Sequence, residues 1–264
     1  MKRIITLTTD FGTRDYYVPS LIGQIRSICP HADIQNLTHE IDSQSIVEAA
    51  FTLKNLYRNF PNDTIHVVVV DPEVGSDRDA VLVRHDHSFF IAPDNGILTL
   101  ALETVTPERV FSIRNSIYQN RMVSPVFHGR DIFTPIAAHL ANGVSPRLLG
   151  EEKKELLDLR WSLPSYDKTR IIGQVIHIDH FGNLISNIHE KFLIEWADSD
   201  TIGVSLAGWE PMKISHTYSD VEAGDPVAVI GSSHQLEIAV YQSKANQLFD
   251  AVIGTQIIVE KLSS

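Results

Sequence analysis

Cysteine is nearly absent from this sequence: Cys29 is the only one among 264 residues. A single cysteine excludes an intramolecular disulfide and a zinc site built from cysteines, and it makes a cytoplasmic location the default expectation. Long apolar runs are absent too, because no stretch approaches the ~18 residues of a membrane helix. The basic N-terminus reaches Asp10 before a long apolar region develops, so we predict a first β-strand and no signal peptide.

Basic residues are outnumbered by acidic ones. The chain has 22 Lys and Arg against 33 Asp and Glu, which gives a formal net charge of -11. Phosphate contacts require clustered basic side chains, so this balance argues against nucleic acid as a partner.

Several ligand-binding motifs are also missing. The sequence has neither a P-loop nor a dinucleotide-binding fingerprint, and H-E-x-x-H and G-x-S-x-G do not occur. His85 and His87 flank Asp86 in a predicted hairpin turn, where a surface position is expected. We therefore predict no metal site and no cofactor.

The first half of the sequence predicts an α/β domain over residues 1–150 with a mostly parallel central sheet. β-branched segments alternate there with segments of helical periodicity. Ser43 or Ser45 is a candidate N-cap for the second helix. The expected strands are 3–9, 64–70 and 89–92, and the expected helices are 18–28, 43–58 and 132–141.

The second half predicts a small all-β, barrel-like C-terminal domain. Residues 151–168 are expected to form a polar linker, and residues 169–264 hold short strand-like segments with little helix between them. The expected strands are 170–178, 184–188, 202–206, 212–216, 227–230, 236–240 and 256–260.

Three acidic residues of the first domain directly follow predicted strands: Asp10, Asp71 and Asp94. Ligand-binding groups in α/β sheets gather at the carboxyl ends of strands, where a carboxylate can be aimed at a ligand. Each of the three also has a structural interpretation, because Asp often caps helices and closes turns.

The segment FHGRD, residues 127–131, concentrates polar chemistry ahead of a predicted helix. His128 is the residue type suited to proton handling near neutral pH. Asp131 is expected to cap the helix, and Arg130 to pair with a nearby carboxylate.

Five motifs in one order resemble the S-adenosylmethionine (SAM) hydroxide adenosyltransferases, relatives of the fluorinating and chlorinating enzymes. The resemblance covers essentially the whole chain and implies an α/β domain followed by a small β-barrel. The motifs are LTTDFG (7–12), VVVDPEVGSDR (68–78), APDNGIL (92–98), FHGRDIFTPIAAHLA (127–141) and HIDHFGNLISNI (177–188).

The resemblance implies hydrolysis of SAM to adenosine and L-methionine by attack of water at ribose C5′. The family's Asp–Arg–His set corresponds here to Asp71, Arg78 and His128, which would handle the attacking water without a metal. Asp71 can accept a proton or orient the water, His128 can hold it, and Arg78 can stabilise developing hydroxide.

Substrate-binding residues are also implied by the resemblance. Asp10 matches the carboxylate that holds the ribose hydroxyls, and its two oxygens suit a vicinal diol. Phe127 lies beside His128 in the shared motif. The family further implies a homotrimer with sites between one subunit's first domain and its neighbour's second. In that second domain, Asp179 and Asn183 match residues near the methionine amine and the adenine, and Ser232 and Ser233 match contacts to the methionine carboxylate.

Alternatives remain open at this point. Pro19, Glu73 and His234 stand where the family pattern has glycine, so the loops around them are expected to differ. A halide-dependent synthase of 5′-halo-5′-deoxyadenosine is the nearest alternative. Gly129 and His128 favour water, since the halide-using relatives have a hydroxyl residue at the first position and lack the histidine. A non-catalytic SAM- or adenosine-binding protein and a phosphate-handling hydrolase are further alternatives.

Overall fold

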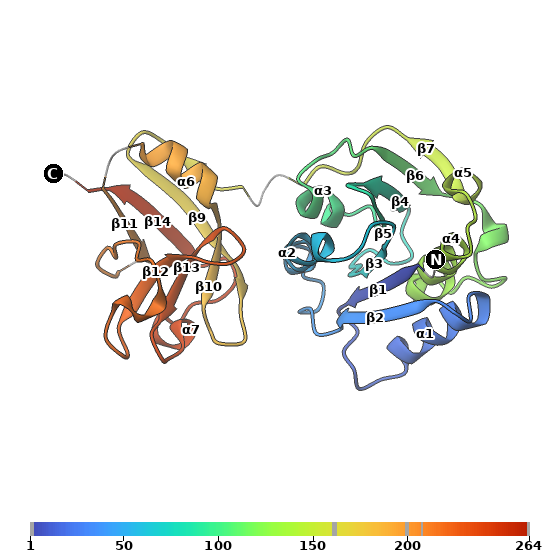
Figure 1. Cartoon of the computed structure of the whole chain (residues 1–264), viewed down its shortest axis with the longest axis horizontal. Coiled ribbons are helices and arrows are strands. Elements are labelled where there is room, and N and C mark those ends of the chain that lie inside the picture. Colours follow the sequence, from blue (N-terminus) through green and yellow to red (C-terminus); the bar gives the residue numbers. More distant parts are fainter. Residues whose placement is uncertain (1–2, 160–162, 199–200, 207, 263–264) are drawn as a thin grey trace. The chain divides into compact units, whose positions relative to one another are not determined.

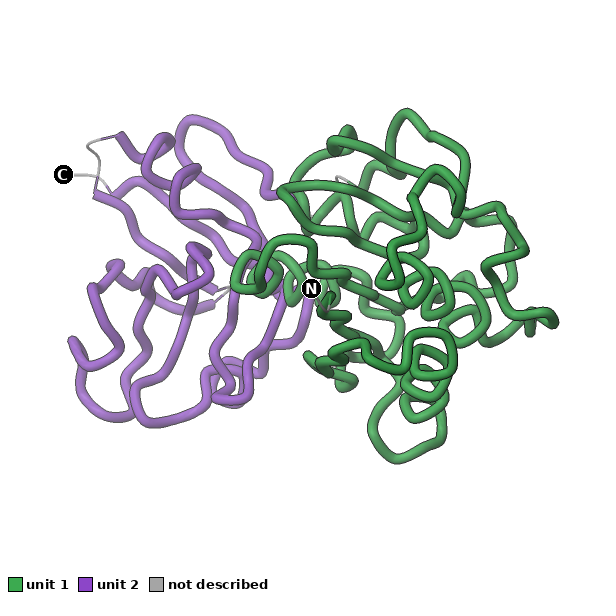
Figure 2. The backbone as a smooth tube through the Cα atoms, turned by 45° about the vertical axis from the view of Figure 1, so that its right-hand side comes forward, with its two compact units in different colours: residues 1–159 green, residues 160–264 purple. Residues whose placement is uncertain are grey.

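The computed structural model describes residues 3–159, 163–198, 201–206 and 208–262. The chain divides into two compact units, residues 1–159 and 160–264, which Figure 2 shows in green and purple. Each unit has its own sheet and hydrophobic core. Residues 151–168, expected as a linker, contribute a strand to each sheet. No helix in the described ranges is long and apolar enough to cross a membrane.

A mixed seven-stranded sheet forms the centre of unit 1, in the order β2-β1-β3-β5-β4-β6-β7 (Figure 1). Strands β2, β1, β3 and β5 run parallel, and β4, β6 and β7 extend the sheet antiparallel. The strands are β1 (Ile4–Thr9), β2 (Asp33–Thr38), β3 (Ile65–Val69), β4 (Ala80–His85), β5 (Ser88–Pro93), β6 (Arg109–Ile113) and β7 (Gly150–Lys153). The hairpin turn predicted around Asp86 is confirmed: His85 ends β4, and Asp86 and His87 form the turn to β5.

Helices cover both faces of this sheet. Alternate residues of β3 enter opposite cores: Val67 packs with α1 and α4, and Val68 packs with α2 and α3. This explains why β3 is buried throughout and is apolar except for His66. The Ser45 side chain caps α2. The helices are α1 (Tyr17–Ile28), α2 (Ile46–Leu56), α3 (Ile97–Leu102), α4 (Thr134–Ala141) and α5 (Pro146–Leu149), with short turns η1 (Tyr57–Asn59) and η2 (Ser116–Tyr118) and a π-helical turn η3 (Gly129–Phe133).

Unit 2 is an antiparallel, nearly closed barrel in the order β11-β14-β9-β10-β13-β12, with β8 paired to β9. Its interior is filled by aliphatic side chains from all the long strands. The strands are β8 (Ser165–Tyr166), β9 (Arg170–Ile178), β10 (Leu184–His189), β11 (Ile202–Leu206), β12 (Pro226–Ile230), β13 (Gln235–Val240) and β14 (Gln256–Lys261). The fold class predicted for both halves is confirmed.

One expectation for unit 2 was wrong. Residues 212–216 form no strand: Met212 bridges to Val204 of β11, and Ile214 bridges to Ala228 of β12. The segment crosses between the two edge strands, so neither pairing extends into a ladder. The unit also contains helix α6 (Glu190–Ala197), besides the shorter α7 (Ala245–Leu248) and turn η4 (Tyr218–Asp220).

Candidate active site

The three acidic residues at strand ends have different surroundings. β1, β3 and β5 are neighbouring parallel strands, so Asp10, Asp71 and Asp94 follow them at the same edge of the sheet. Asp94 accepts hydrogen bonds from Lys153 Nζ at 2.5 Å and from the Leu157 backbone N–H at 2.9 Å. Asp94 therefore has a structural role, whereas Asp10 and Asp71 remain candidates for ligand binding.

Asp71, Arg78 and His128 form one connected set. Arg78 Nε lies 3.0 Å from both carboxylate oxygens of Asp71, and Arg78 Nη2 bonds to the same carboxylate. Arg78 Nη2 also donates to His128 Nδ1 at 2.8 Å. The side chains of Arg78 and Asp71 are only 6% and 4% exposed. The structure thus brings together the three residues that the sequence singled out for water activation.

A close backbone approach positions this set. Gly75, in the loop between β3 and β4, has φ +85°, and a Cβ there would lie 2.5 Å from the carbonyl oxygen of Pro125. Only glycine allows the loop to pack so closely against the segment that leads to His128. His128 then directly precedes the π-helical turn η3, a rare conformation that is frequent at functional sites.

The contacts of His128 define its protonation. Burial lowers the pKa of His128, and the adjacent Arg78 cation lowers it further. Because arginine can only donate, Nδ1 must be the acceptor and the neutral ring carries its hydrogen on Nε2. The ring can therefore donate from Nε2 to a water oxygen while Asp71 supplies an acceptor.

Aromatic side chains surround Phe127, which is buried. Its ring makes edge contacts with Phe11 at 6.0 Å and Tyr17 at 5.3 Å between centroids, and the Arg130 guanidinium lies 4.9 Å from its centre. These contacts hold the residue before His128 in place.

The candidate residues of unit 2 lie in two strand-connecting turns. Between β9 and β10, the backbone N–H and side-chain amide of Asn183 donate to the Asp179 carboxylate at 2.9 and 3.0 Å. Ser232 and Ser233 occupy the β12–β13 turn, which the His234 N–H closes onto the Gly231 carbonyl at 3.0 Å. The structure brings Asp179 and Asn183 into direct contact and leaves the serine pair in its own turn.

Sequence reasoning missed Glu237 beside that turn. This β13 residue is 6% exposed, and its Oε1 accepts a hydrogen bond from Tyr218 at 2.7 Å. Burial raises the pKa of Glu237, and the Asp179 charge raises it further. A Cβ on Gly231 would meet Glu237 Oε2 at 2.4 Å, so the carboxyl group lies directly under the turn. The only sequence signal was a glutamate within an otherwise apolar strand, LEIAV.

The sequence comparisons identify the family. A model of the SAM hydroxide adenosyltransferase N-terminal domain matches residues 5–150, and the C-terminal domain model of the same family matches residues 173–258. The chain belongs to the SAM hydroxide adenosyltransferase family.

Relatives of this chain align over most of its length. A protein named (R)-S-adenosyl-L-methionine hydrolase, from Methanocaldococcus jannaschii, is 33% identical and aligns over 94% of this chain and 92% of its own. A fluorinase from Actinopolyspora mzabensis is 25% identical over 90% of both chains. The crystal structure of an uncharacterized conserved protein from Thermotoga maritima, 30% identical, superposes with a TM-score of 0.89 and covers 97% of this chain and 100% of that one.

The departures from the family pattern have local explanations. Pro19 lies in the first turn of α1, where its missing N–H is tolerated. Glu73 is not among the described residues with positive φ, so its backbone needs no glycine. His234 does have φ +59°, and its Nδ1 lies 2.9 Å from Glu190 Oε2. Of these three residues, only His234 therefore has a backbone conformation that favours glycine.

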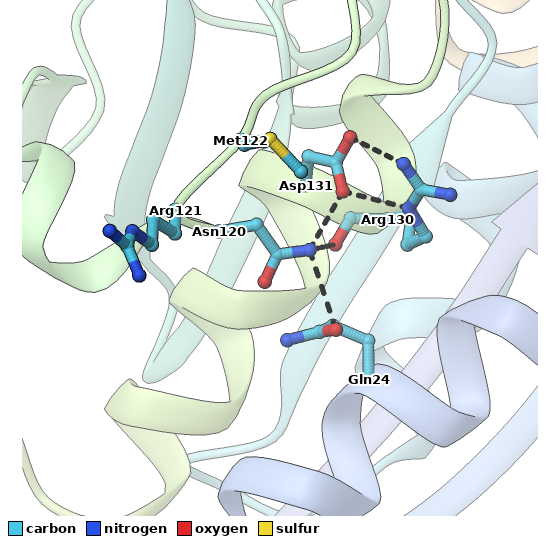
Figure 3. A pocket seen from close by; sticks show the side chains of 6 residues that line it. All are labelled: Gln24, Asn120, Arg121, Met122, Arg130 and Asp131. Atoms are coloured by element: carbon cyan, nitrogen blue, oxygen red, sulfur yellow. Dashed lines mark hydrogen bonds and ion pairs between the residues drawn. The ribbon is translucent and has the colours of Figure 1, made fainter.

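Asp131 does not cap a helix, contrary to expectation. It is fully buried inside η3, and its carboxylate accepts from Arg130 Nε and Nη2, from Asn120 Nδ2 and from the Ser124 N–H. The predicted pairing of Arg130 with a carboxylate is correct. Figure 3 shows the bonds of Asp131 to Arg130 and Asn120. Gln24, Asn120, Arg121, Met122, Arg130 and Asp131 line a cavity of about 500 Å³. Asp131 thus fixes the segment before His128, and none of the predicted site residues lines that cavity.

Proposed function

We propose that this chain hydrolyses SAM to adenosine and L-methionine, with Asp71, Arg78 and His128 activating the attacking water. The observation that carries the proposal is the directly bonded set of these three side chains, with Asp71 and Arg78 buried and His128 half-buried, in a member of this family. A protein that only binds SAM would not need these three side chains to contact one another, whereas here they are directly bonded.

The residue chemistry suits the reaction. The new bond joins the water oxygen to ribose C5′, the C5′–sulfur bond breaks, and the electron pair leaves with methionine as a neutral thioether. The water proton passes to the Asp71 carboxylate, the one anionic acceptor in the set. Bulk water has a pKa of about 15.7, so the set must supply orientation and charge stabilisation. His128 donates from Nε2 to the water oxygen, and Arg78 stabilises the developing hydroxide.

Burial of the set favours this chemistry. Hydroxide and sulfonium charges cancel as the bond forms, so a dry site favours the transition state over the separated ions. Asp71 and Arg78 form an ion pair, and their mutual attraction offsets part of the desolvation cost of burying two charged side chains. We further propose that the reaction needs no metal ion.

The structure around Gly129 disfavours the halide alternative. A Cβ at this position would lie 3.3 Å from Leu21 Cδ2, which is a tight contact, and 3.4 Å from Phe11, which is the short limit of ordinary contact. A hydroxyl-bearing residue, which the halide-using relatives have here, would require the end of the Leu21 side chain to give by a few tenths of an ångström. Water is therefore the better-supported nucleophile.

We propose that the active form is a homotrimer. The candidate residues divide between unit 1 (Asp10, Asp71, Arg78, Phe127 and His128) and unit 2 (Asp179, Asn183, Ser232 and Ser233). Unit 1 exposes the large apolar side chains of Ile117, Met122 and Val126 within residues 117–126, and a subunit contact in the trimer would remove them from water. In the trimer, residues of one subunit's unit 1 would act on SAM held by a neighbour's unit 2.

Product identification tests the proposed reaction. Purified protein is incubated with SAM in chloride-free buffer and again with added chloride, and the nucleoside is identified by mass spectrometry. Adenosine and methionine in both samples support hydrolysis. A chlorinated nucleoside in the second sample supports the halide alternative, and unchanged SAM supports a binding protein.

A further inference from the structure

The loop that carries Asp10 is tied to the loop that follows β2. Four hydrogen bonds join the two segments, and three of them involve backbone groups or buried side chains. They are Gly12 N–H to His39 O at 2.7 Å, Thr9 Oγ1 with His39 Nδ1 at 2.9 Å, Thr13 Oγ1 to Glu40 Oε1 at 3.1 Å, and Gln44 N–H to Asp10 Oδ2 at 2.9 Å.

The bond from Gln44 depends on an unusual backbone conformation. Gln44 has φ +69°, a left-handed conformation that L-residues other than glycine adopt rarely. It directly precedes Ser45, the N-cap of α2, and its side chain is exposed. Burial of the Gln44 side chain therefore does not account for its left-handed backbone. That backbone does direct the Gln44 N–H toward the Asp10 carboxylate.

We propose that Gln44 is a positioning residue for SAM: its left-handed backbone aims an N–H at Asp10 Oδ2 and so fixes the carboxylate that receives the ribose hydroxyls. This inference rests on the proposed function and on the role of Asp10 in it. Strain held at such a point is typical of ligand-binding sites, where the surrounding structure maintains it.

The hydrogen-bond count is consistent with this role. A carboxylate has about four lone-pair sites, and the Gln44 N–H occupies one of them. The described residues supply no donor to Asp10 Oδ1, so both oxygens keep acceptor capacity for a vicinal diol. This one bond restrains rotation of the carboxylate and leaves room for two hydroxyl donors.

A series of Gln44 variants tests the proposal through steady-state kinetics. Gln44→Val places a β-branched residue, which disfavours positive φ, and we expect the KM for SAM to rise about tenfold with kcat changed far less. Gln44→Gly and Gln44→Asn adopt this φ readily and keep the N–H, so they should rescue a KM close to that of the unaltered chain. Asp250→Val is the matched control, because Asp250 is exposed and has φ +49° at a different place in the fold. It should leave the KM unchanged.

A substrate analogue separates positioning from general damage. With the 2′-deoxyribose analogue of SAM, the ratio of KM values between Gln44→Val and the unaltered chain should fall well below tenfold, because one hydroxyl partner of Asp10 is missing. Equal KM values for the Val and Gly variants, or equal ratios for both substrates, would overturn the proposal. If Gln44→Val does not fold, the test uses Gln44→Gly and Gln44→Asn, and a raised KM for SAM in these two variants would overturn the proposal. Failure of the unaltered chain to consume SAM would instead overturn the proposed function itself.

Discussion

Acidification is expected to destabilise unit 1 through one buried histidine. His66, on β3, is fully buried, its Nδ1 lies 2.9 Å from Thr6 Oγ1, and its ring stacks on Phe90 at 5.2 Å. Its Nε2 atom has no hydrogen-bond partner within the described ranges. Burial lowers the pKa of His66 from 6.5 to about 4. The folded protein therefore keeps this ring neutral at a pH where the unfolded chain protonates it.

The sign and size of the effect follow from proton linkage. Between pH 6.5 and 4 the unfolded state binds more protons than the folded state, so stability falls as the pH falls through this window. A shift of this size makes the free energy of unfolding about 2 kcal/mol smaller at pH 5 than at pH 7 through His66 alone. Burial also lowers the pKa values of His39 and His139, which adds to the same trend.

Urea unfolding at pH 7 and pH 5 measures this loss. His66→Gln removes the titrating group. The free energy of unfolding of this variant should therefore decrease from pH 7 to pH 5 by about 2 kcal/mol less than that of the unaltered chain. The matched control is His31→Gln, since His31 is exposed and its replacement should leave the loss unchanged. Identical losses in His66→Gln and the unaltered chain would refute the reasoning, because the other histidines are common to both.

Further predictions concern the proposed site and the family departures. Asp71→Asn keeps the side-chain shape but removes its charge, so kcat should fall ~10²–10⁴-fold with KM little changed; full activity in this variant would contradict the water-activating role. A strong chelator should leave turnover unchanged, and loss of activity that a divalent ion restores would disprove metal independence. His234→Gly should raise the free energy of urea unfolding by up to about 1 kcal/mol, because glycine adopts φ +59° without steric cost; a lower stability would count against this account of strain. Mixing inactive Asp71→Asn and Asn183→Ala proteins under subunit exchange should recover partial activity, and a mixture that exchanges but stays inactive would exclude shared sites.

Local patterns predicted most of the fold because burial leaves a clear signature. The run 64–70 has no polar residue after His66, and it became a central strand with a core on either face. The segment 212–216 alternates apolar and polar residues as a strand does, but it has no continuous partner, since its bridges change from Val204 to Ala228. Strand propensity is a property of a segment's own residues, whereas a ladder also requires a neighbouring strand along the whole segment.

The site could be predicted only in part for the same reason. The strand-end position of Asp71 and the composition of FHGRD singled out Asp71 and His128. The bond from Arg78 to His128 joins residues 50 positions apart, and it depends on the approach of Gly75 to Pro125. Sequence position alone gave no basis for that approach, so the role of Arg78 came from the family resemblance. Gln44 and Glu237 escaped prediction because the position of the first depends on backbone conformation and that of the second on burial.

Isotope labelling tests the central claim, that water activated by Asp71, Arg78 and His128 attacks ribose C5′. SAM is incubated with the protein in H₂¹⁸O, and both products are examined by mass spectrometry. The account predicts ¹⁸O in the 5′-hydroxyl of adenosine and none in methionine, with both products formed in equal amounts. A nucleoside without ¹⁸O, or label incorporated into methionine, would contradict it.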